Sequence, residues 1–255
     1  MWRHFIISLI GCISVANAFS STRARLLPLT QPSNAARSCA SKSSTALLVG
    51  LTLYGSQGSR SPLVNWAAYE LGLDFTMGDL AKNPHPFGQI PCLVDTDKDA
   101  TVFESGAILL YMTTLASKDD KKSQAEVYSW VCWANASLDP ICFLETPDGK
   151  VYDTGLKNSN NKRIRQLDQI LDQRQYLVSE DKFSVADVAV ASYLLYVIQF
   201  FPDIDLSPWP GIVRYLKDCV SREAYAKAFG PPVQAFLVEK LENMGNKDKK
   251  LFGMF

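Results

Sequence analysis

The stretch NPHPFGQIPCLVD, residues 83–95, reads as a loop that runs into a short buried strand. Ile90 and the apolar residues 92–94 give the strand, yet Pro91 stands at its start. Proline has no backbone N–H to donate, so strands accept it only at an edge, a first residue or a bulge. Two interpretations are open at this point: the backbone beside Pro91 is reserved for a ligand and not for a neighbouring strand, or a trans Pro91 merely starts an edge strand.

The first 46 residues differ in kind from the rest of the chain. Arg3, an apolar run over residues 5–15 and the A-x-A pattern Ala16-Asn17-Ala18 have the layout of a signal peptide. Residues 19–46 are rich in Ser, Ala and Arg and contain no acidic residue, as a transit peptide does. The two in tandem resemble the bipartite presequence used to reach the secondary plastids of algae. We predict a signal peptide over residues 1–18, a transit-peptide-like or disordered segment over residues 19–46, and a plastid location. The alternative is secretion or an endomembrane location.

The remaining part of the chain is acidic and poor in histidine. Five of the 26 basic residues lie in the first 46, which leaves 21 basic against 26 acidic residues. A net charge of about −5 argues against nucleic acid or an anionic membrane as a partner. Four cysteines remain without a C-x-x-C pair, and His85 is the only histidine left. We therefore expect no metal site, no histidine-based triad and no membrane span in the mature protein.

Strand and helix patterns alternate from residue 47 to residue 116. Apolar periodicity predicts strands over residues 47–55, 73–80, 90–95 and 101–104, and helices over residues 61–73 and 105–116. Ser61 is predicted as the N-cap of the first helix, with Pro62 at its first position. The order β-α-β, loop, β-β-α is that of a thioredoxin-like domain.

Helical patterns dominate from residue 121 onward, and we expect no strand beyond Ser117. Amphipathic helices are predicted over residues 123–145, with a kink near Pro140, and over residues 161–180. Residues 184–200 are apolar almost all round, which predicts the central helix of a bundle. Its start carries a capping-box pattern, Ser184 to Asp187, flanked by Phe183 and Val188 as a hydrophobic staple. With shorter helices near residues 212–220 and 232–243, an all-α domain spans residues 121–245 and a tail follows over residues 246–255.

Four segments in order carry a resemblance to a known family. They are GSRSPLVNWAAYELGLDF, FGQIPCLVD, VFESGAILLYM and FSVADVAVASYLLY. Together they resemble the soluble glutathione S-transferases over nearly all of residues 47–240, most like the chi and serine-type classes. The resemblance implies a thioredoxin-like N-terminal domain, residues 47–116, followed by the all-helical bundle. It also implies glutathione as co-substrate and a homodimer, in which the α/β half of one subunit faces the helical half of the other.

The resemblance also implies contacts for glutathione, an anionic tripeptide. A cis Pro91 would turn the backbone of Ile90 outward, to pair with the cysteinyl part of the ligand like an added strand. Glu104 would pair with the α-ammonium group, and Ser105, at a helix start, would hold the α-carboxylate. Two further contacts, to the peptide and to the glycyl carboxylate, are implied for Gln89 and Lys82.

The thiol of glutathione must ionise before it can attack, and a free thiol has a pKa near 8.5. The loop YGSQGSRSP, residues 54–62, leads to a helix N-terminus, which favours an anion. Comparison with the serine-type classes puts Ser59 near the catalytic serine. Comparison with the beta class puts Arg60 and Ser61 at the catalytic cysteine and the serine after it. The tyrosine-type classes put Tyr54 at the catalytic tyrosine and Arg60 at a glutathione-contacting arginine. Ser59 is the first candidate, followed by Arg60 and Ser61, with Tyr54 last; an N-cap role for Ser61 and core packing for Tyr54 are the structural alternatives.

The resemblance favours an enzyme that conjugates glutathione to small hydrophobic electrophiles, or reduces peroxides with it. The electrophile is expected between the two halves, against the helix that carries Tyr128, Trp130, Trp133 and Phe143. The alternative is a non-catalytic scaffold, either a carrier of pigments or tetrapyrroles or a subunit of a protein complex. Thiol exchange lacks its nucleophile, because residues 54–62 contain no cysteine and Cys92 is most simply a small buried strand residue.

Overall fold

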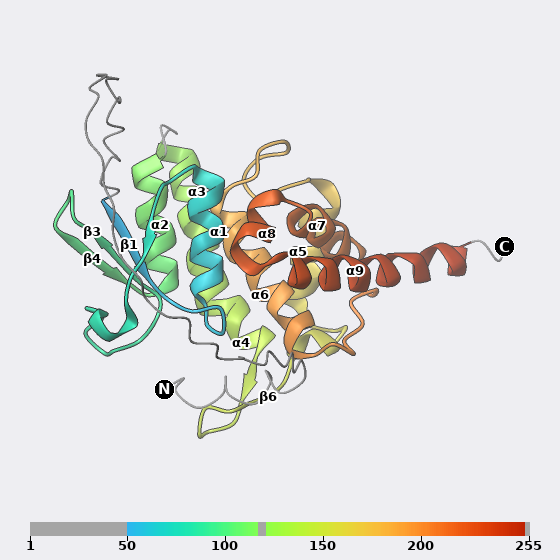
Figure 1. Cartoon of the computed structure of the whole chain (residues 1–255). Coiled ribbons are helices and arrows are strands. Elements are labelled where there is room, and N and C mark those ends of the chain that lie inside the picture. Colours follow the sequence, from blue (N-terminus) through green and yellow to red (C-terminus); the bar gives the residue numbers. More distant parts are fainter. Residues whose placement is uncertain (1–49, 117–120, 253–255) are drawn as a thin grey trace, which may run out of the picture. The chain divides into compact units, whose positions relative to one another are not determined.

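A computed structural model describes residues 50–116 and 121–252 of the chain (Figure 1). The predicted signal and transit segments, residues 1–46, lie outside the described residues. The described part consists of a four-stranded sheet with its helices and a larger group of helices that follows in the sequence.

The sheet contains β1 (Leu51–Tyr54), β2 (Thr76–Met77), β3 (Cys92–Asp95) and β4 (Ala100–Phe103), in the order β2-β1-β3-β4. β1 is parallel to β2 and antiparallel to β3, and β3 is antiparallel to β4. Helix α1 (Ser61–Leu71) crosses over between β1 and β2, and α2 (Ser105–Ala116) follows β4. This order and this mixed sheet confirm the predicted thioredoxin-like domain.

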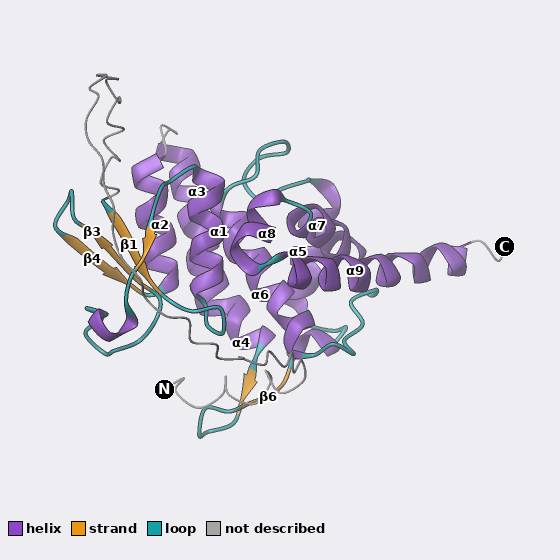
Figure 2. Cartoon of the chain, viewed as in Figure 1, coloured by secondary structure: helices purple, strands orange, loops and turns teal. Residues whose placement is uncertain are grey.

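The helical half is built around one buried helix (Figure 2). Its elements are α3 (Lys121–Trp133), the π-helical segment η2 (Ala134–Leu138), α4 (Asp139–Cys142), α5 (Lys162–Gln173), α6 (Val185–Phe200), α7 (Pro210–Val220), α8 (Glu223–Phe229) and α9 (Pro231–Phe252). Every residue of α6 from Val185 to Ile198 is buried, as its continuous apolar sequence predicts. Helices α1 and α2 of the α/β half also pack against α6, so the two halves share one core.

The structure departs from the sequence prediction in several short segments. A hairpin of β5 (Leu144–Glu145) and β6 (Val151–Asp153) follows α4, so the expectation of no strand beyond Ser117 was wrong. Two- and three-residue strands are too short to give a periodic pattern, and their turn depends on Gly149 at a φ of 77°. Helix α8 and the short 3-10 helices η1 (Leu80–Lys82) and η3 (Gly155–Lys157) were also not predicted. Helix α9 continues past residue 245, where the sequence predicts a separate tail.

The predicted kink near Pro140 takes the form of a π-helical turn. Residues 134–138 adopt this wider turn, and the helix resumes at Asp139 with Pro140 in its first turn. Proline has no N–H to donate to the preceding turn and crowds the carbonyl four residues before it. The irregularity therefore falls where the sequence places the helix-breaking residue.

Asp187 joins the start of α6 to two other parts of the helical half. Its Oδ2 accepts hydrogen bonds from the Ser184 backbone N–H and hydroxyl, both at 2.9 Å, as the capping-box pattern predicts. Its Oδ1 accepts from the Leu177 N–H at 2.9 Å and from the Tyr215 hydroxyl at 3.2 Å. Burial raises the pKa of Asp187, and these hydrogen bonds oppose that rise. A fully buried carboxylate thus satisfies four donors that would otherwise lack partners.

Within residues 50–116 and 121–252, no helix is both long enough and apolar enough to cross a membrane.

We predict that Asp187→Ala lowers the free energy of unfolding by about 3 kcal/mol or more, because it leaves several buried donors without an acceptor. Urea denaturation followed by circular dichroism would measure the loss. Asp203→Ala, on an exposed loop residue, is the matched control and should stay within about 0.5 kcal/mol of wild type. Equal midpoints for the two variants would contradict this account of Asp187.

Candidate functional site

Three segments that are far apart in the sequence meet at one end of the sheet. Tyr54, the last residue of β1, pairs with Cys92, the first of β3, and Cys92 pairs with Phe103, the last of β4. The loop to α1, the Ile90–Pro91 bond and the Glu104–Ser105 pair therefore start from neighbouring strand positions. This register brings the predicted site residues to the same end of the sheet.

The Ile90–Pro91 peptide bond is cis, which confirms the prediction from the sequence. Ile90 lies just outside the strand ladder, which begins at Cys92. The preceding loop is closed by Asn83, whose Nδ2 donates to the Gln89 carbonyl at 2.7 Å. The backbone of Ile90 thus lies beyond the end of the inner strand β3, next to Gln89, whose side chain is exposed.

His85 organises the loop before Pro91. His85 is 6% exposed. Its ring atom Nδ1 accepts the backbone N–H of Phe87 at 3.0 Å, and its backbone N–H donates to Asn83 Oδ1 at 3.1 Å. Its ring packs against Phe103, with 5.0 Å between the ring centroids. His85 is therefore a structural residue of this loop, while Lys82, at the end of η1, is exposed.

Glu104 has an unusual backbone conformation, with a φ of 68°. A non-glycine residue in this left-handed region costs on the order of 1–3 kcal/mol, and such residues cluster at functional sites. Its carbonyl accepts the Ile108 N–H at 3.0 Å, so Glu104 opens helix α2 with an exposed side chain. The next residue, Ser105, is 5% exposed and begins the first turn of α2. The backbone N–H groups of such a turn lack helical partners and can hold a carboxylate.

A cluster of serines forms the turn into α1. The Ser59 hydroxyl donates to the Ser56 carbonyl at 2.8 Å and accepts the Ser61 N–H at 3.0 Å. The Ser61 hydroxyl accepts the Ser56 N–H at 3.1 Å and lies 2.6 Å from Ser59 Oγ. Helix α1 begins at Ser61, so the predicted N-cap role of Ser61 was wrong: the Ser59 side chain accepts the N–H at the start of the helix. Ser61 is only 3% exposed, whereas Ser59 is half-buried.

Tyr54 lies at the end of β1 and is half-buried. Its ring covers Gly78, where an added Cβ would come within 2.5 Å of the ring. The contact gives Tyr54 a packing role against the segment that follows β2.

Arg60 joins the turn into α1 to the helical half. Its guanidinium forms two hydrogen bonds with the Asp139 carboxylate, both at 2.7 Å, and donates to the Tyr193 hydroxyl at 2.9 Å. Burial raises the pKa of Asp139, and the charge of Arg60 opposes that rise. Asp139 thus compensates the positive charge of Arg60 beside the two candidate serines.

Sequence reasoning missed Asp139 and Tyr193. The signal for Asp139 was a carboxylate next to a helix-breaking proline within an otherwise apolar stretch, SLDPIC. The signal for Tyr193 was a polar-tipped aromatic inside a continuous apolar helix. Both patterns indicate a buried polar contact, but neither identifies its partner.

Cys92 does not offer a nucleophile at this site. It is fully buried, and burial raises the pKa of its thiol. A raised pKa leaves less of the reactive thiolate. Among the described residues, no group of three or more His, Cys, Asp or Glu side chains could hold a metal ion.

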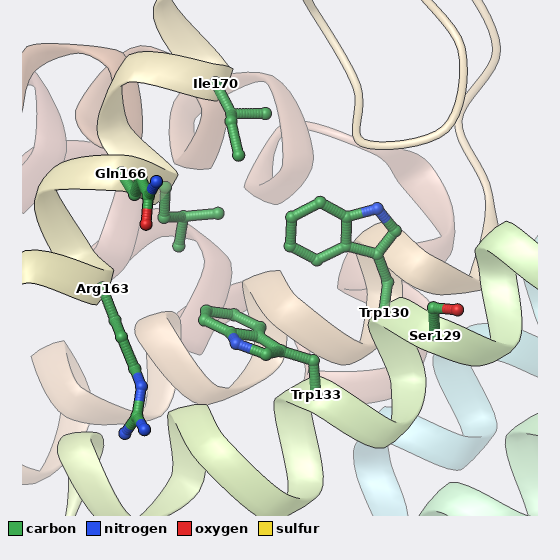
Figure 3. Close-up of a pocket in the computed structure, with 7 residues that line it drawn as sticks. Ser129, Trp130, Trp133, Arg163, Gln166 and Ile170 are labelled. Carbon is green, nitrogen blue, oxygen red and sulfur yellow. The ribbon is translucent and has the colours of Figure 1, made fainter.

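A pocket of about 310 Å³ opens in the helical half, and all the residues that line it belong to α3 and α5 (Figure 3). Trp130 and Trp133 form one wall, with their ring centroids 5.5 Å apart. Arg163 and Gln166 face them from α5. No residue of the α/β half contributes to this pocket. The sequence predicts that these tryptophans face a site between the two halves, but they line a pocket within the helical half. Phe143 is buried against Phe200, with 5.5 Å between the ring centroids.

A thioredoxin-like domain joined to a helical domain, with these segments gathered at the sheet end, defines the glutathione transferase fold. The family model described as "Glutathione S-transferase, N-terminal domain" matches residues 49–114, and "Glutathione S-transferase, C-terminal domain" matches residues 130–223. Between them the two matches span well over half of the chain. The chain belongs to the glutathione S-transferase family.

Individual relatives are distant. Glutathione S-transferase GstB of Escherichia coli strain K12 is 27% identical over 181 residues, which cover 66% of this chain and 85% of the relative. The solved structure of Ure2p in complex with glutathione aligns with a TM-score of 0.58 at 19% identity, over 72% of this chain and 95% of that one. A theta class glutathione S-transferase from Xanthomonas axonopodis pv. citri, with glutathione bound, gives 0.55 at 20% identity, over 71% and 98%. At these identities the solved structures establish the fold.

Proposed function

We propose that this protein is a glutathione transferase, which binds glutathione as the thiolate and conjugates it to small hydrophobic electrophiles or uses it to reduce peroxides. The observation that carries the proposal is the register Tyr54–Cys92–Phe103, which puts three candidate ligand-binding segments at one end of the sheet. The family membership and the solved relatives that hold glutathione support the same ligand.

In this proposal the peptide lies at the end of the sheet where the three segments meet. The backbone of Ile90, beside the cis Pro91, pairs with the cysteinyl part as an added strand would. The exposed carboxylate of Glu104 meets the α-ammonium group, and the start of α2 at Ser105 holds the α-carboxylate. Gln89 and Lys82, both exposed, complete the set of contacts on the side of the loop.

We assign thiol activation to Ser59, as in the serine-type classes. Its hydroxyl lies at the start of α1 and is closer to solvent than that of Ser61. To serve the thiolate, it must redirect its proton from the Ser56 carbonyl to the sulfur. Ser61 supports it, because the Ser61 hydroxyl accepts the Ser56 N–H and can donate to Ser59 Oγ.

We predict that the full chain lowers the pKa of the glutathione thiol, and that Ser59→Ala raises it again by about one to two units. A hydrogen bond to a charged group contributes about 1.5–3 kcal/mol, and one pKa unit corresponds to about 1.4 kcal/mol. The measurement is a titration of thiolate ultraviolet absorbance from pH 5 to pH 9 at saturating glutathione.

Ser56→Ala is the control for this titration. Ser56 lies in the same turn but takes part through its backbone groups, so its variant should keep the wild-type thiol pKa. If Ser61→Ala or Tyr54→Phe raised the thiol pKa and Ser59→Ala did not, the assignment to Ser59 would be wrong. If the wild-type chain produced no thiolate at all, the transferase proposal would fail and a non-catalytic scaffold would be favoured.

We further propose that two copies associate, with the α/β half of one against the helical half of the other. Phe87 is 73% exposed on the α/β half, next to the partly exposed Phe103, with 6.3 Å between their ring centroids. The helical half offers the apolar pocket beside Trp130 and Trp133, whose volume admits an aromatic side chain. A two-fold axis would form this contact twice and close the assembly as a dimer.

Phe87→Ser is expected to weaken the dimer at least about tenfold, because a buried aromatic anchor contributes 2 kcal/mol or more. Sedimentation velocity over a concentration series would give the dissociation constant. Tyr152→Ser changes another highly exposed aromatic, on β6, and should leave the constant unchanged. A monomeric wild type, or equal constants for the two variants, would rule this contact out.

For residues 1–46 we propose a plastid address, on the sequence evidence alone. Fusion of these residues to a fluorescent protein in an alga with a secondary plastid is expected to label the plastid. Deletion of residues 19–46 should leave a working signal peptide and divert the fusion to the secretory route. Secretion of the fusion with its whole leader would favour the alternative location.

A further inference from the structure

Tyr193 is a buried tyrosine of α6 whose hydroxyl joins two neighbours of the candidate site. It is 1% exposed. Its hydroxyl accepts from Arg60 Nη1 at 2.9 Å and donates to Asn135 Oδ1 at 2.8 Å. Arg60 belongs to the turn that carries Ser59. One side chain from the helical half therefore connects this turn to Asn135.

Asn135 extends this contact toward the first turn of α2. Its Nδ2 donates to the Val131 carbonyl at 2.8 Å, which fixes the side-chain amide. A Cβ added at Gly106 would come within 2.8 Å of the same nitrogen, so the start of α2 lies directly against the Asn135 side chain. Asn135 therefore contacts both the Tyr193 hydroxyl and Gly106, the residue after Ser105.

The π-helical segment Ala134–Leu138 contains Asn135 and ends immediately before Asp139. Such wider turns are rare and often occur at functional sites. In a regular α-helix, residues four apart such as Asn135 and Asp139 lie on one face, whereas the wider turn changes the angle between them. Here Asn135 bonds to Tyr193 and Asp139 bonds to Arg60.

The turn into α1 is held from the helical half at two more points. The Tyr196 hydroxyl donates to the Ser59 carbonyl at 3.2 Å, and Gln57 Nε2 donates to the Ala228 carbonyl at 3.0 Å. The position of Ser59 is therefore determined by helices that lie outside its own domain.

We propose that Tyr193 is a positioning residue, which holds the turn that carries Ser59 and the start of α2 at a fixed separation, through Arg60 on one side and through Asn135, which lies against Gly106, on the other. The inference rests on the proposed function, since it concerns the same glutathione site. Arg60 acts here as a connector, because its charge is taken up by Asp139 at 2.7 Å. Tyr193 itself acts through these neighbours and not on the ligand.

The test compares Tyr193→Phe with Tyr215→Phe in the full chain. Both variants remove one buried tyrosine hydroxyl that is hydrogen-bonded, but Tyr215 bonds to Asp187 and not to the site. Tyr193→Phe is expected to weaken glutathione binding about tenfold, as loss of a hydrogen bond to a charged partner does. It should also raise the pKa of the bound thiol, because Ser59 loses its register with the ligand. Calorimetric titration and the thiolate absorbance titration measure the two effects.

Tyr215→Phe shows what the loss of a buried hydroxyl does when only stability is affected. It should lower the urea midpoint while leaving both the glutathione affinity and the thiol pKa at their wild-type values. If Tyr193→Phe changed only the urea midpoint, or if both variants changed the thiol pKa equally, the positioning role would be overturned and the proposed function would stand. A wild-type chain that neither binds glutathione nor ionises it would overturn both proposals.

Discussion

The pairing of β3 with β1 on one side and β4 on the other is the constraint on which the site depends. Tyr54, Cys92 and Phe103 are neighbours across three strands, so the residues next to each of them leave the sheet at the same end. A one-residue slip of β3 would move every side chain of that strand to the opposite face. The buried Cys92 and Leu93 make such a slip costly, because each has a place in the core.

Two aspartates, Asp187 fully buried and Asp139 partly buried, make contacts that lie outside the sheet. Asp187 ties the start of α6 to the segment before it and to α7, whereas Asp139 ties the helical half to Arg60. Burial opposes ionisation in both, as the raised pKa values indicate. Such buried polar groups add little net stability, but with one partner removed they are strongly destabilising. Asp139 therefore favours one arrangement of the two halves, and Asp187 favours one arrangement within the helical half.

Local chemistry explains what the sequence could predict. Some features depend on only a few neighbouring residues, so their patterns can be recognised in the sequence. These are Pro91, the capping box at Ser184 and Asp187, and the Glu104–Ser105 pair. The Arg60–Asp139 pair joins residues 79 positions apart, and no local pattern links them. The helix start was misjudged by one residue for a related reason. Ser59 and Ser61 are equally good caps by residue type. No local pattern shows that the Ser59 hydroxyl accepts the Ser61 N–H, which leaves Arg60 as the residue before the helix.

In the proposed function, the compensated charge of Arg60 limits how the thiol of glutathione can be activated. A guanidinium paired with a carboxylate at 2.7 Å presents little net charge to a ligand nearby. The remaining sources are the N-terminus of α1, which is worth about 0.3–1 kcal/mol for an anion, and a serine hydrogen bond to a charged acceptor, about 1.5–3 kcal/mol. Lowering a thiol pKa from about 8.5 to near 7 requires about 2 kcal/mol. A helix start and one well-placed hydroxyl are therefore sufficient for the proposed activation, in which the role of Arg60 is to hold Ser59 in place.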